Sequence, residues 1–190
     1  MAVLSNVEIV TALDQGRLVI RPRPEPPLGD AATPYGTSSV DLRLAPEILC
    51  PGRDLLSLTF DLGRGNIPET LGRVFDRTTL PETGWPLPPG QFVLAKTVEH
   101  VELPLNGGLA ARIEGRSSFA RTGLLVHFTA PTIHAGFAGT ITLEMINLGP
   151  LPLTLRPGIR LCQLIVESVQ GIPEPAGSQF QGQGTPSGAP

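Results

Sequence analysis

Hydrophobic and polar residues alternate over short stretches along much of the chain, and this two-residue period is typical of β-strands. In residues 38–44 the apolar Val40 and Leu42 share one face of a predicted strand. Asp41 and Arg43 share the opposite face, and we interpret them as a structural charge pair beside the sheet.

Strand-like stretches are dense from residue 108 onward, and turns rich in glycine and proline separate them. Many short strands joined by tight turns are typical of antiparallel barrels and jelly-rolls. We therefore predict a mainly-β fold of that kind. The predicted strands cover residues 18–20, 38–44, 55–60, 92–95, 109–113, 124–128, 139–147, 151–155 and 159–166, with a less regular alternation over 98–103.

One short helix is predicted near the start of the chain. Ser5 followed by Glu8 matches a capping box, in which the serine hydroxyl accepts a hydrogen bond from the first turn. Apolar residues follow at helical spacing and Gly16 ends the segment, so the helix is expected over residues 6–15. Residues 21–27 contain four prolines and are expected to form an extended surface loop.

Length and composition indicate one domain with a tail. The chain has 190 residues, and its last residues are poor in apolar side chains, so we assign a barrel domain to residues 1–170 and a flexible tail to 171–190. A net charge of −3 argues against a general nucleic-acid or membrane-surface binder. Without a leader or an apolar run near 18 residues, a cytoplasmic location is expected. Cys50 and Cys162 are expected to be reduced thiols without a catalytic role, with a disulfide as the alternative.

Residues 114–123, which we call the arginine–serine stretch, concentrate groups that bind anions. They include two arginines, two serines and two glycines. Arginine forks and serine hydroxyls bind phosphate oxygens, and glycine lets backbone amides approach a ligand. The stretch therefore predicts an anion site, and the alternative is a polar loop without a ligand.

A single carboxylate lies in the predicted strand at residues 139–147. Ile141 and Leu143 share the apolar face of this strand, whereas Thr142 and Glu144 share the other face. Residues on such a face are most often solvated. Glu144 becomes a candidate general base only if it points into a pocket.

Several well-known catalytic patterns are absent from the sequence. His127 and His134 are seven residues apart without a cysteine pair, so the zinc-deaminase pattern of His-x-Glu with Pro-Cys-x-x-Cys is missing. The P-loop, the nucleophile elbow and the Rossmann glycine pattern are missing too. We therefore expect no zinc.

Four motifs in a fixed order carry a resemblance to a known family. They are residues 115–124, 126–130, 136–144 and 155–164. Together they resemble the dCTP deaminases of the trimeric dUTPase superfamily. The likeness extends to that family's N-terminal helix, first core strand and closing C-terminal tail, at residues 4–9 with 16–18, 38–44 and 179–183.

The resemblance implies a distorted antiparallel β-barrel of the dUTPase-like type, a homotrimer, and active sites between subunits. It implies that the arginine–serine stretch holds a triphosphate, that Mg²⁺ is bound mainly by the phosphates, and that the tail closes over the nucleotide. The implied catalytic groups are Glu144, Arg121, Ser117 and the Ala130 backbone. The implied substrate-binding residues are Arg116, Ser117, Ser118, Phe119, Ala120, Arg121, His134, Thr142, Leu143, Glu144, Gln179 and Gln183.

By the same resemblance, the expected activity is hydrolytic deamination of dCTP to dUTP and ammonia. A water near the Ala130 carbonyl would lose a proton to Glu144 and attack C4 of cytosine, because without a metal a carboxylate must activate the water. By this resemblance, related dUTPases carry an apolar residue at the Glu144 position, so the glutamate here favours deamination over diphosphate hydrolysis. His134 stands where both branches usually have an aspartate. The alternatives are a dUTP diphosphatase, a bifunctional dUMP-forming dCTP deaminase, and a non-catalytic nucleotide-binding trimer. dTTP is the candidate feedback inhibitor.

Overall fold

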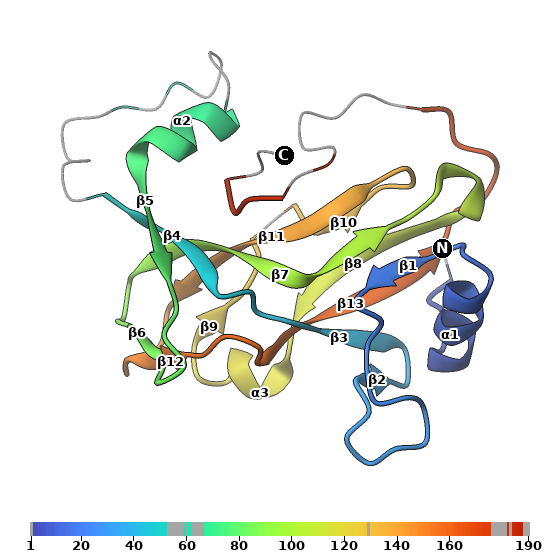
Figure 1. Ribbon diagram of the computed structural model, residues 1–190, viewed down its shortest axis with the longest axis horizontal. Coiled ribbons are helices and arrows are strands. Elements are labelled where there is room, and N and C mark those ends of the chain that lie inside the picture. Colours follow the sequence, from blue (N-terminus) through green and yellow to red (C-terminus); the bar gives the residue numbers. More distant parts are fainter. Residues whose placement is uncertain are drawn as a thin grey trace.

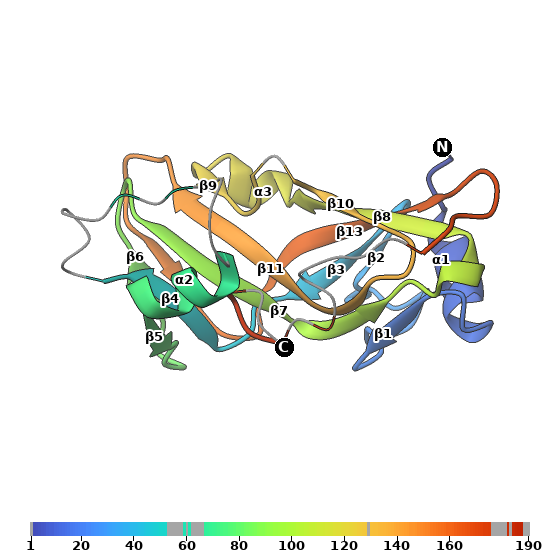
Figure 2. The same ribbon diagram turned by 90° about the horizontal axis from the view of Figure 1, so that it is seen from above.

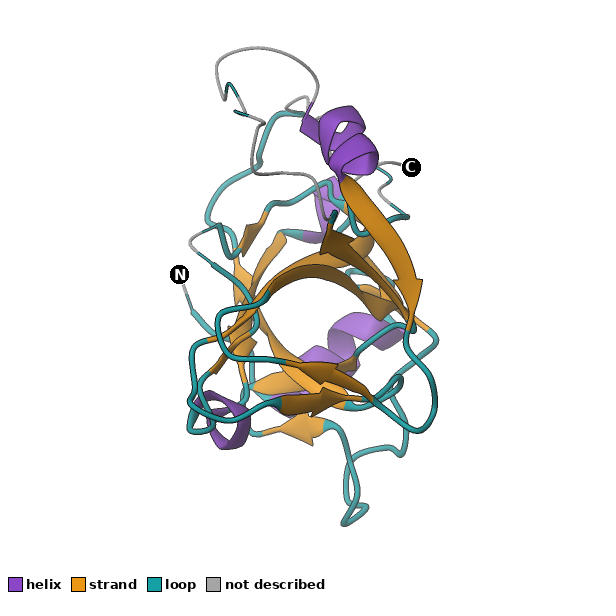
Figure 3. Cartoon of the chain, turned by 90° about the vertical axis from the view of Figure 1, so that its left-hand side faces the viewer, coloured by secondary structure: helices purple, strands orange, loops and turns teal. Residues whose placement is uncertain are grey.

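The computed structural model describes residues 2–52, 59, 61, 67–128, 130–175, 182 and 184–187. The strand expected over residues 55–60 lies outside this set except for residue 59, and Gln179 and Gln183 lie outside it too. The described chain folds into two antiparallel sheets that curve around a shared core (Figures 1 and 3). This mainly-β architecture confirms the fold class that the alternating pattern predicts.

The two sheets, which we call sheet A and sheet B, are assembled from strands distant in sequence. In spatial order, sheet A contains β10 (Thr132–Ile133), β8 (Leu109–Gly115), β13 (Arg160–Ser168), β3 (Ser39–Arg43) and β2 (Tyr35–Gly36). Sheet B contains β5 (Phe75–Thr79), β4 (Glu47–Pro51), β7 (Phe92–Glu102), β11 (Ala138–Asn147) and β9 (Leu124–Leu125), with β1 (Val19–Arg21) also paired to β7. β12 (Leu153–Leu155) and β6 (Trp85–Leu87) form a separate two-stranded ribbon.

The core lies between the two sheets and is filled by alternate residues of each strand. In β11, Ile141, Leu143 and Met145 are almost completely buried, as their spacing predicts. The intervening residues of β11, among them Thr142 and Glu144, point out of sheet B and are only partly buried. Because the side-chain period of a strand is two, the core and the outward face of β11 are fixed together.

The helix α1 (Asn6–Asp14) confirms the helix predicted from the capping residues, since the Ser5 hydroxyl accepts a hydrogen bond of 3.3 Å from the Glu8 amide. Two further helices, α2 (Ile67–Val74) and α3 (Ser117–Ala120), and a short 3₁₀ helix (Leu105–Gly107) were not predicted. α1 and α2 lie at opposite ends of the molecule (Figure 2).

Several predicted strands have other boundaries in the structure. The stretches at residues 92–95 and 98–103 belong to one continuous strand, β7. The strand predicted over residues 124–128 ends at Leu125, because only Leu124 and Leu125 pair with β11. The chain then leaves sheet B, and this departure carries His127 onto the outward face of β11.

The interpretation of Asp41 and Arg43 as partners of each other is wrong. Arg43 binds Glu99, with 2.6 Å between Nε and Oε1, while Asp41 faces Arg116. Residues two apart on a strand are separated by about 6.6 Å, whereas neighbours on adjacent strands are nearer. Each charge therefore pairs across the fold and not along its own strand.

Both cysteines, Cys50 and Cys162, are free thiols, which confirms the expectation of reduced cysteines over the disulfide alternative. Cys162 is fully buried, and burial raises the pKa of its thiol. Among the described residues, no helix is both long and apolar enough to cross a membrane.

Candidate active site

Glu144 lies on the outward face of sheet B, near the middle of β11. Its cross-strand neighbour on β7 is Leu94, and the pairs on either side are Thr142 with Lys96 and Ile146 with Phe92. The Glu144 side chain retains 30% of its exposure, while its Oε2 atom is completely buried. The carboxylate is thus partly buried and not freely solvated.

His127 contacts Glu144 directly, with its Nδ1 atom facing the Glu144 Oε2 atom. The other ring nitrogen, Nε2, lies 3.1 Å from the Ala130 carbonyl oxygen. Burial disfavours the charged imidazolium, but the hydrogen bond and negative charge of Glu144, with the Ala130 carbonyl, outweigh it and raise the pKa of His127. In its protonated form, His127 can donate both to the Ala130 carbonyl and to the Glu144 Oε2 atom, and so hold this carboxylate oxygen in place.

An aromatic stack holds the segment that carries His127. The ring of Phe128 stacks on Phe92 with 5.8 Å between centroids and 12° between planes, and Phe75 meets Phe92 edge-on at 6.2 Å. Such pairs stabilise by about 1 kcal/mol beyond the area they bury. Together with the contact to the Ala130 carbonyl, the stack fixes the chain directly after His127.

We expect replacement of His127 by asparagine to destabilise the fold in a pH-dependent way. Because the pKa of His127 is raised in the folded state, its contribution is fully present below its ordinary value of 6.5 and is lost as the pH rises through the raised value. The free energy of unfolding should fall by about 1.5 kcal/mol at low pH, which is the usual contribution of a hydrogen bond to a charged group. Urea unfolding from pH 5.5 to 9 measures it.

The exposed His134 provides the control for this experiment. Its replacement by asparagine should shift the urea midpoint little at any pH. A His127→Asn variant whose destabilisation stayed constant across the range would contradict the proposed ion pair.

Thr142 adds an unpaired hydroxyl to the same face of β11. Its Oγ1 atom is buried and has no hydrogen-bond partner within the described part of the chain. A buried hydroxyl that stays unpaired costs roughly 1–3 kcal/mol, so such an atom marks a place where a ligand can bind. Leu143, between Thr142 and Glu144, points into the core, so any contact it makes to a ligand would come from its backbone.

The arginine–serine stretch begins at the end of β8 and forms α3. Ser117, Ser118 and Arg121 are exposed, and Ala120 is exposed beside them. The φ of +92° at Gly123 lets the chain turn back after α3. The hydroxyls and one guanidinium of this stretch are therefore accessible to an anion.

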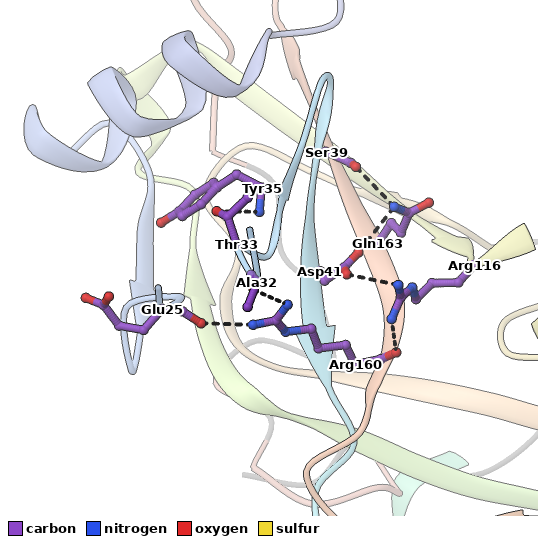
Figure 4. A network of polar contacts seen from close by, with 9 residues as sticks. All are labelled: Glu25, Ala32, Thr33, Tyr35, Ser39, Asp41, Arg116, Arg160 and Gln163. Atoms are coloured by element: carbon purple, nitrogen blue, oxygen red, sulfur yellow. Dashed lines mark hydrogen bonds and ion pairs between the residues drawn. The ribbon is translucent and has the colours of Figure 1, made fainter. Parts of the chain in front are cut away.

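Arg116 is oriented by contacts with sheet A (Figure 4). Its Nη1 atom donates to the Arg160 carbonyl at 2.9 Å, and its Nη2 atom lies 3.6 Å from Asp41 Oδ2. Gln163 in turn donates to Asp41 at 3.2 Å. The Arg116 guanidinium also lies 5.7 Å from the centroid of Phe119, which is a cation–π distance.

Within one chain, the arginine–serine stretch and Glu144 face different sides of the molecule. Arg116 binds Asp41 on the outward side of sheet A, whereas Glu144 points out of sheet B. No hydrogen bond or ion pair joins residues 116–121 to Glu144 in the described part of the chain. The structure therefore groups Glu144, Thr142 and Ala130 together, and places the predicted anion site apart from them.

His134 follows β10 at the edge of sheet A and is exposed. The C-terminal segment, by which we mean residue 182 and residues 184–187, reaches the outward face of sheet B. The Gly182 amide donates to the Ala138 carbonyl at 2.9 Å, and Lys96 Nζ donates to the Gly184 carbonyl. The face that carries Thr142 and Glu144 is thus also the face that the end of the chain contacts.

Two residues of this site, His127 and Lys96, were missed by the sequence analysis. His127 was considered only as a zinc ligand, and the alternating pattern placed it inside a strand that ends earlier. Across the described ranges, no group of three or more His, Cys, Asp or Glu side chains is placed to hold a metal ion.

Comparison with known proteins finds relatives of one family that match most of the chain. A family model described as dCTP deaminase-like matches residues 3–169. A dUMP-forming dCTP deaminase of Dictyoglomus thermophilum is 37% identical, over 97% of this chain and 92% of that protein. A dCTP deaminase of Rhodospirillum rubrum is 40% identical, over 87% and 82%.

A solved structure shows the same fold. The crystal structure of 2′-deoxycytidine 5′-triphosphate deaminase from Agrobacterium tumefaciens superimposes with a TM-score of 0.63 at 23% identity. The match covers 86% of this chain and 47% of that chain. At this level of identity the likeness establishes the arrangement of the strands.

Proposed function

Since this chain belongs to the dCTP deaminase-like family, we propose that it catalyses the hydrolytic deamination of dCTP to dUTP and ammonia. The observation that carries the proposal is the half-buried carboxylate of Glu144. One of its oxygens contacts His127, and it lies two residues from the Thr142 hydroxyl, which has no partner among the described residues.

In the proposed reaction, Glu144 is the general base. His127 occupies the buried Oε2 atom, so Oε1 is left to take a proton from water. The Ala130 carbonyl, already 3.1 Å from His127 Nε2, has a second lone pair with which to orient that water. Glu144 delivers that proton to N3 of cytosine as the water oxygen attacks C4. It then takes the second proton from the C4 hydroxyl and passes it to the amino group, so the C4–N bond breaks and ammonia leaves as the C4 carbonyl forms.

We assign the triphosphate to the arginine–serine stretch, where Ser117, Ser118 and Arg121 are accessible and Arg116 is oriented by Asp41. Guanidinium and hydroxyl groups suit phosphate oxygens, and a guanidinium has no lone pair with which to ligate a divalent cation. Mg²⁺ would therefore enter with the triphosphate and neutralise part of its charge. The remaining steps are assigned to Glu144, His127 and the Ala130 carbonyl, so the proposed reaction does not use zinc.

We also propose that the active site is completed by a second copy of the chain, in a homotrimer. The support is that Arg116 and Glu144 point out of opposite sheets, so one chain cannot easily present both to the same nucleotide. dTTP has the same sugar and triphosphate as dCTP, so the same residues would bind it as a feedback inhibitor. Because the substrate is a nucleotide, we also propose a cytoplasmic location for the reaction.

A second candidate activity is the dUMP-forming reaction, because the Dictyoglomus thermophilum relative bears that name. Incubation with dCTP and Mg²⁺ separates the two when ammonia, nucleotide and pyrophosphate are measured together. We expect ammonia and dUTP in equal amounts without pyrophosphate. dUMP with pyrophosphate would establish the second activity, and tight dCTP binding without any product would contradict both.

A further inference from the structure

The outward face of sheet B carries a row of three polar side chains beside Glu144. Lys96 on β7 is the cross-strand partner of Thr142 on β11. On its other side, the pairing of Leu49 with Leu94 places Glu47 of β4 opposite Lys96. Glu47, Lys96 and Thr142 therefore lie side by side, one row away from Glu144.

Lys96 is the only lysine of the chain, and its side chain is mostly buried, with 20% of it exposed. Its Nζ atom donates to the Gly184 carbonyl and lies 3.9 Å from Glu47 Oε1. That Oε1 atom is buried without a hydrogen bond in the described part of the chain, while Oε2 binds Arg77 at 3.1 Å. The negative charge of Glu47 thus offsets the cost of burying the Lys96 ammonium.

The C-terminal segment is attached to this face at two points. The Gly182 amide donates to Ala138 at the start of β11, and the Gly184 carbonyl accepts from Lys96. Beyond them, Ser187 is 92% buried, and its hydroxyl lies 3.0 Å from that of Thr185. The segment is therefore attached to sheet B through Ala138 and through Lys96, the cross-strand neighbour of Thr142.

We propose that Lys96 is a positioning residue that fastens the C-terminal segment over Thr142 and Glu144. Glu47 fixes the direction of the ammonium, and the ammonium binds a main-chain carbonyl, so the contact depends on the path of the segment and not on its side chains. The role of this contact in closing the site rests on the proposed function. The contact itself is independent of catalysis.

Hydrogen exchange of the Gly182 amide, measured by NMR without nucleotide, tests the proposal. In Lys96→Met the amide should exchange roughly tenfold faster than in the unaltered protein, because one charge-assisted bond holding the segment is lost. Lys96→Arg should bring the rate back to within about threefold, since a guanidinium also donates to a carbonyl. An unchanged Gly182 rate in Lys96→Met would overturn the proposal.

Arg156 provides a matched control, because its guanidinium also donates to a main-chain carbonyl, that of Glu82 at 3.0 Å, but at the distant ribbon. Arg156→Met should leave Gly182 exchange unchanged, and an equal acceleration would mean that Lys96 acts through general stability.

A reciprocal measurement does not require a change at Lys96. Gly182→Pro removes the donor amide, so acetylation of Lys96, read by mass spectrometry, should become about tenfold faster. An unaltered acetylation rate would overturn the fastening role.

Neither readout requires turnover. A protein that shows both effects but releases no ammonia from dCTP would retain the fastening role and lose the proposed function. A protein that deaminates dCTP, but in which Gly182 exchange does not respond to Lys96→Met, would retain the proposed function and lose the fastening role.

Discussion

Replacement of Glu144 by glutamine is expected to lower kcat for dCTP deamination by roughly 10³-fold while leaving the Kd for dCTP within about threefold. Glutamine has nearly the same shape but cannot accept the proton of the attacking water. Its amide can still face His127, so the site should keep its structure. Steady-state ammonia release and calorimetric titration with dCTP measure the two quantities.

The control for this substitution is Glu82→Gln, which makes the same chemical change at an exposed turn. We expect it to leave kcat unchanged. A Glu144→Gln protein that turned over dCTP at the unaltered rate would remove Glu144 from the mechanism. Loss of dCTP binding together with kcat would instead assign Glu144 to nucleotide binding.

The second large effect is expected at Gly123, where α3 turns back toward sheet B. Its φ is +92°, and a Cβ at this position would lie 2.2 Å from the Gly149 amide nitrogen. A clash with main chain cannot be relieved by a side-chain rotation, so Gly123→Ala must displace the turn that ends the arginine–serine stretch. We expect the free energy of unfolding to fall by about 4 kcal/mol. Strain from the positive φ accounts for roughly 1–2 kcal/mol of this, and the clash accounts for the rest.

Gly158 allows these two contributions to be separated. It has a similar φ of +78°, but nothing lies within 4 Å of the place where a Cβ would be. Gly158→Ala should therefore cost only the backbone strain, about 1 kcal/mol. Equal urea midpoints for the two variants would contradict the close packing of Gly123 against Gly149.

The local pattern predicted those features that depend on neighbouring residues in sequence. The cap at Ser5 predicted α1, and the alternation around Glu144 predicted which face of β11 it occupies, because both follow from backbone geometry over a few residues. The mainly-β class follows in the same way from many short alternating stretches.

Features set by pairing between distant strands were not predictable. Arg43 binds Glu99, 56 residues away, and Lys96 binds Gly184, 88 residues away. His127 reaches Glu144 only because β9 stops at Leu125, which no local pattern marks. Register between strands depends on the complete fold, so the identity of charge partners and of the contacts around Glu144 required the structure.

In the proposed mechanism water attacks the base and not the phosphate, and a reaction in ¹⁸O-labelled water distinguishes these two sites of attack. Mass spectrometry of the product from dCTP locates the label. We predict one ¹⁸O atom on the pyrimidine ring of dUTP, with the phosphates unlabelled. Label found only in phosphate, with the cytosine amino group retained, would contradict deamination at Glu144.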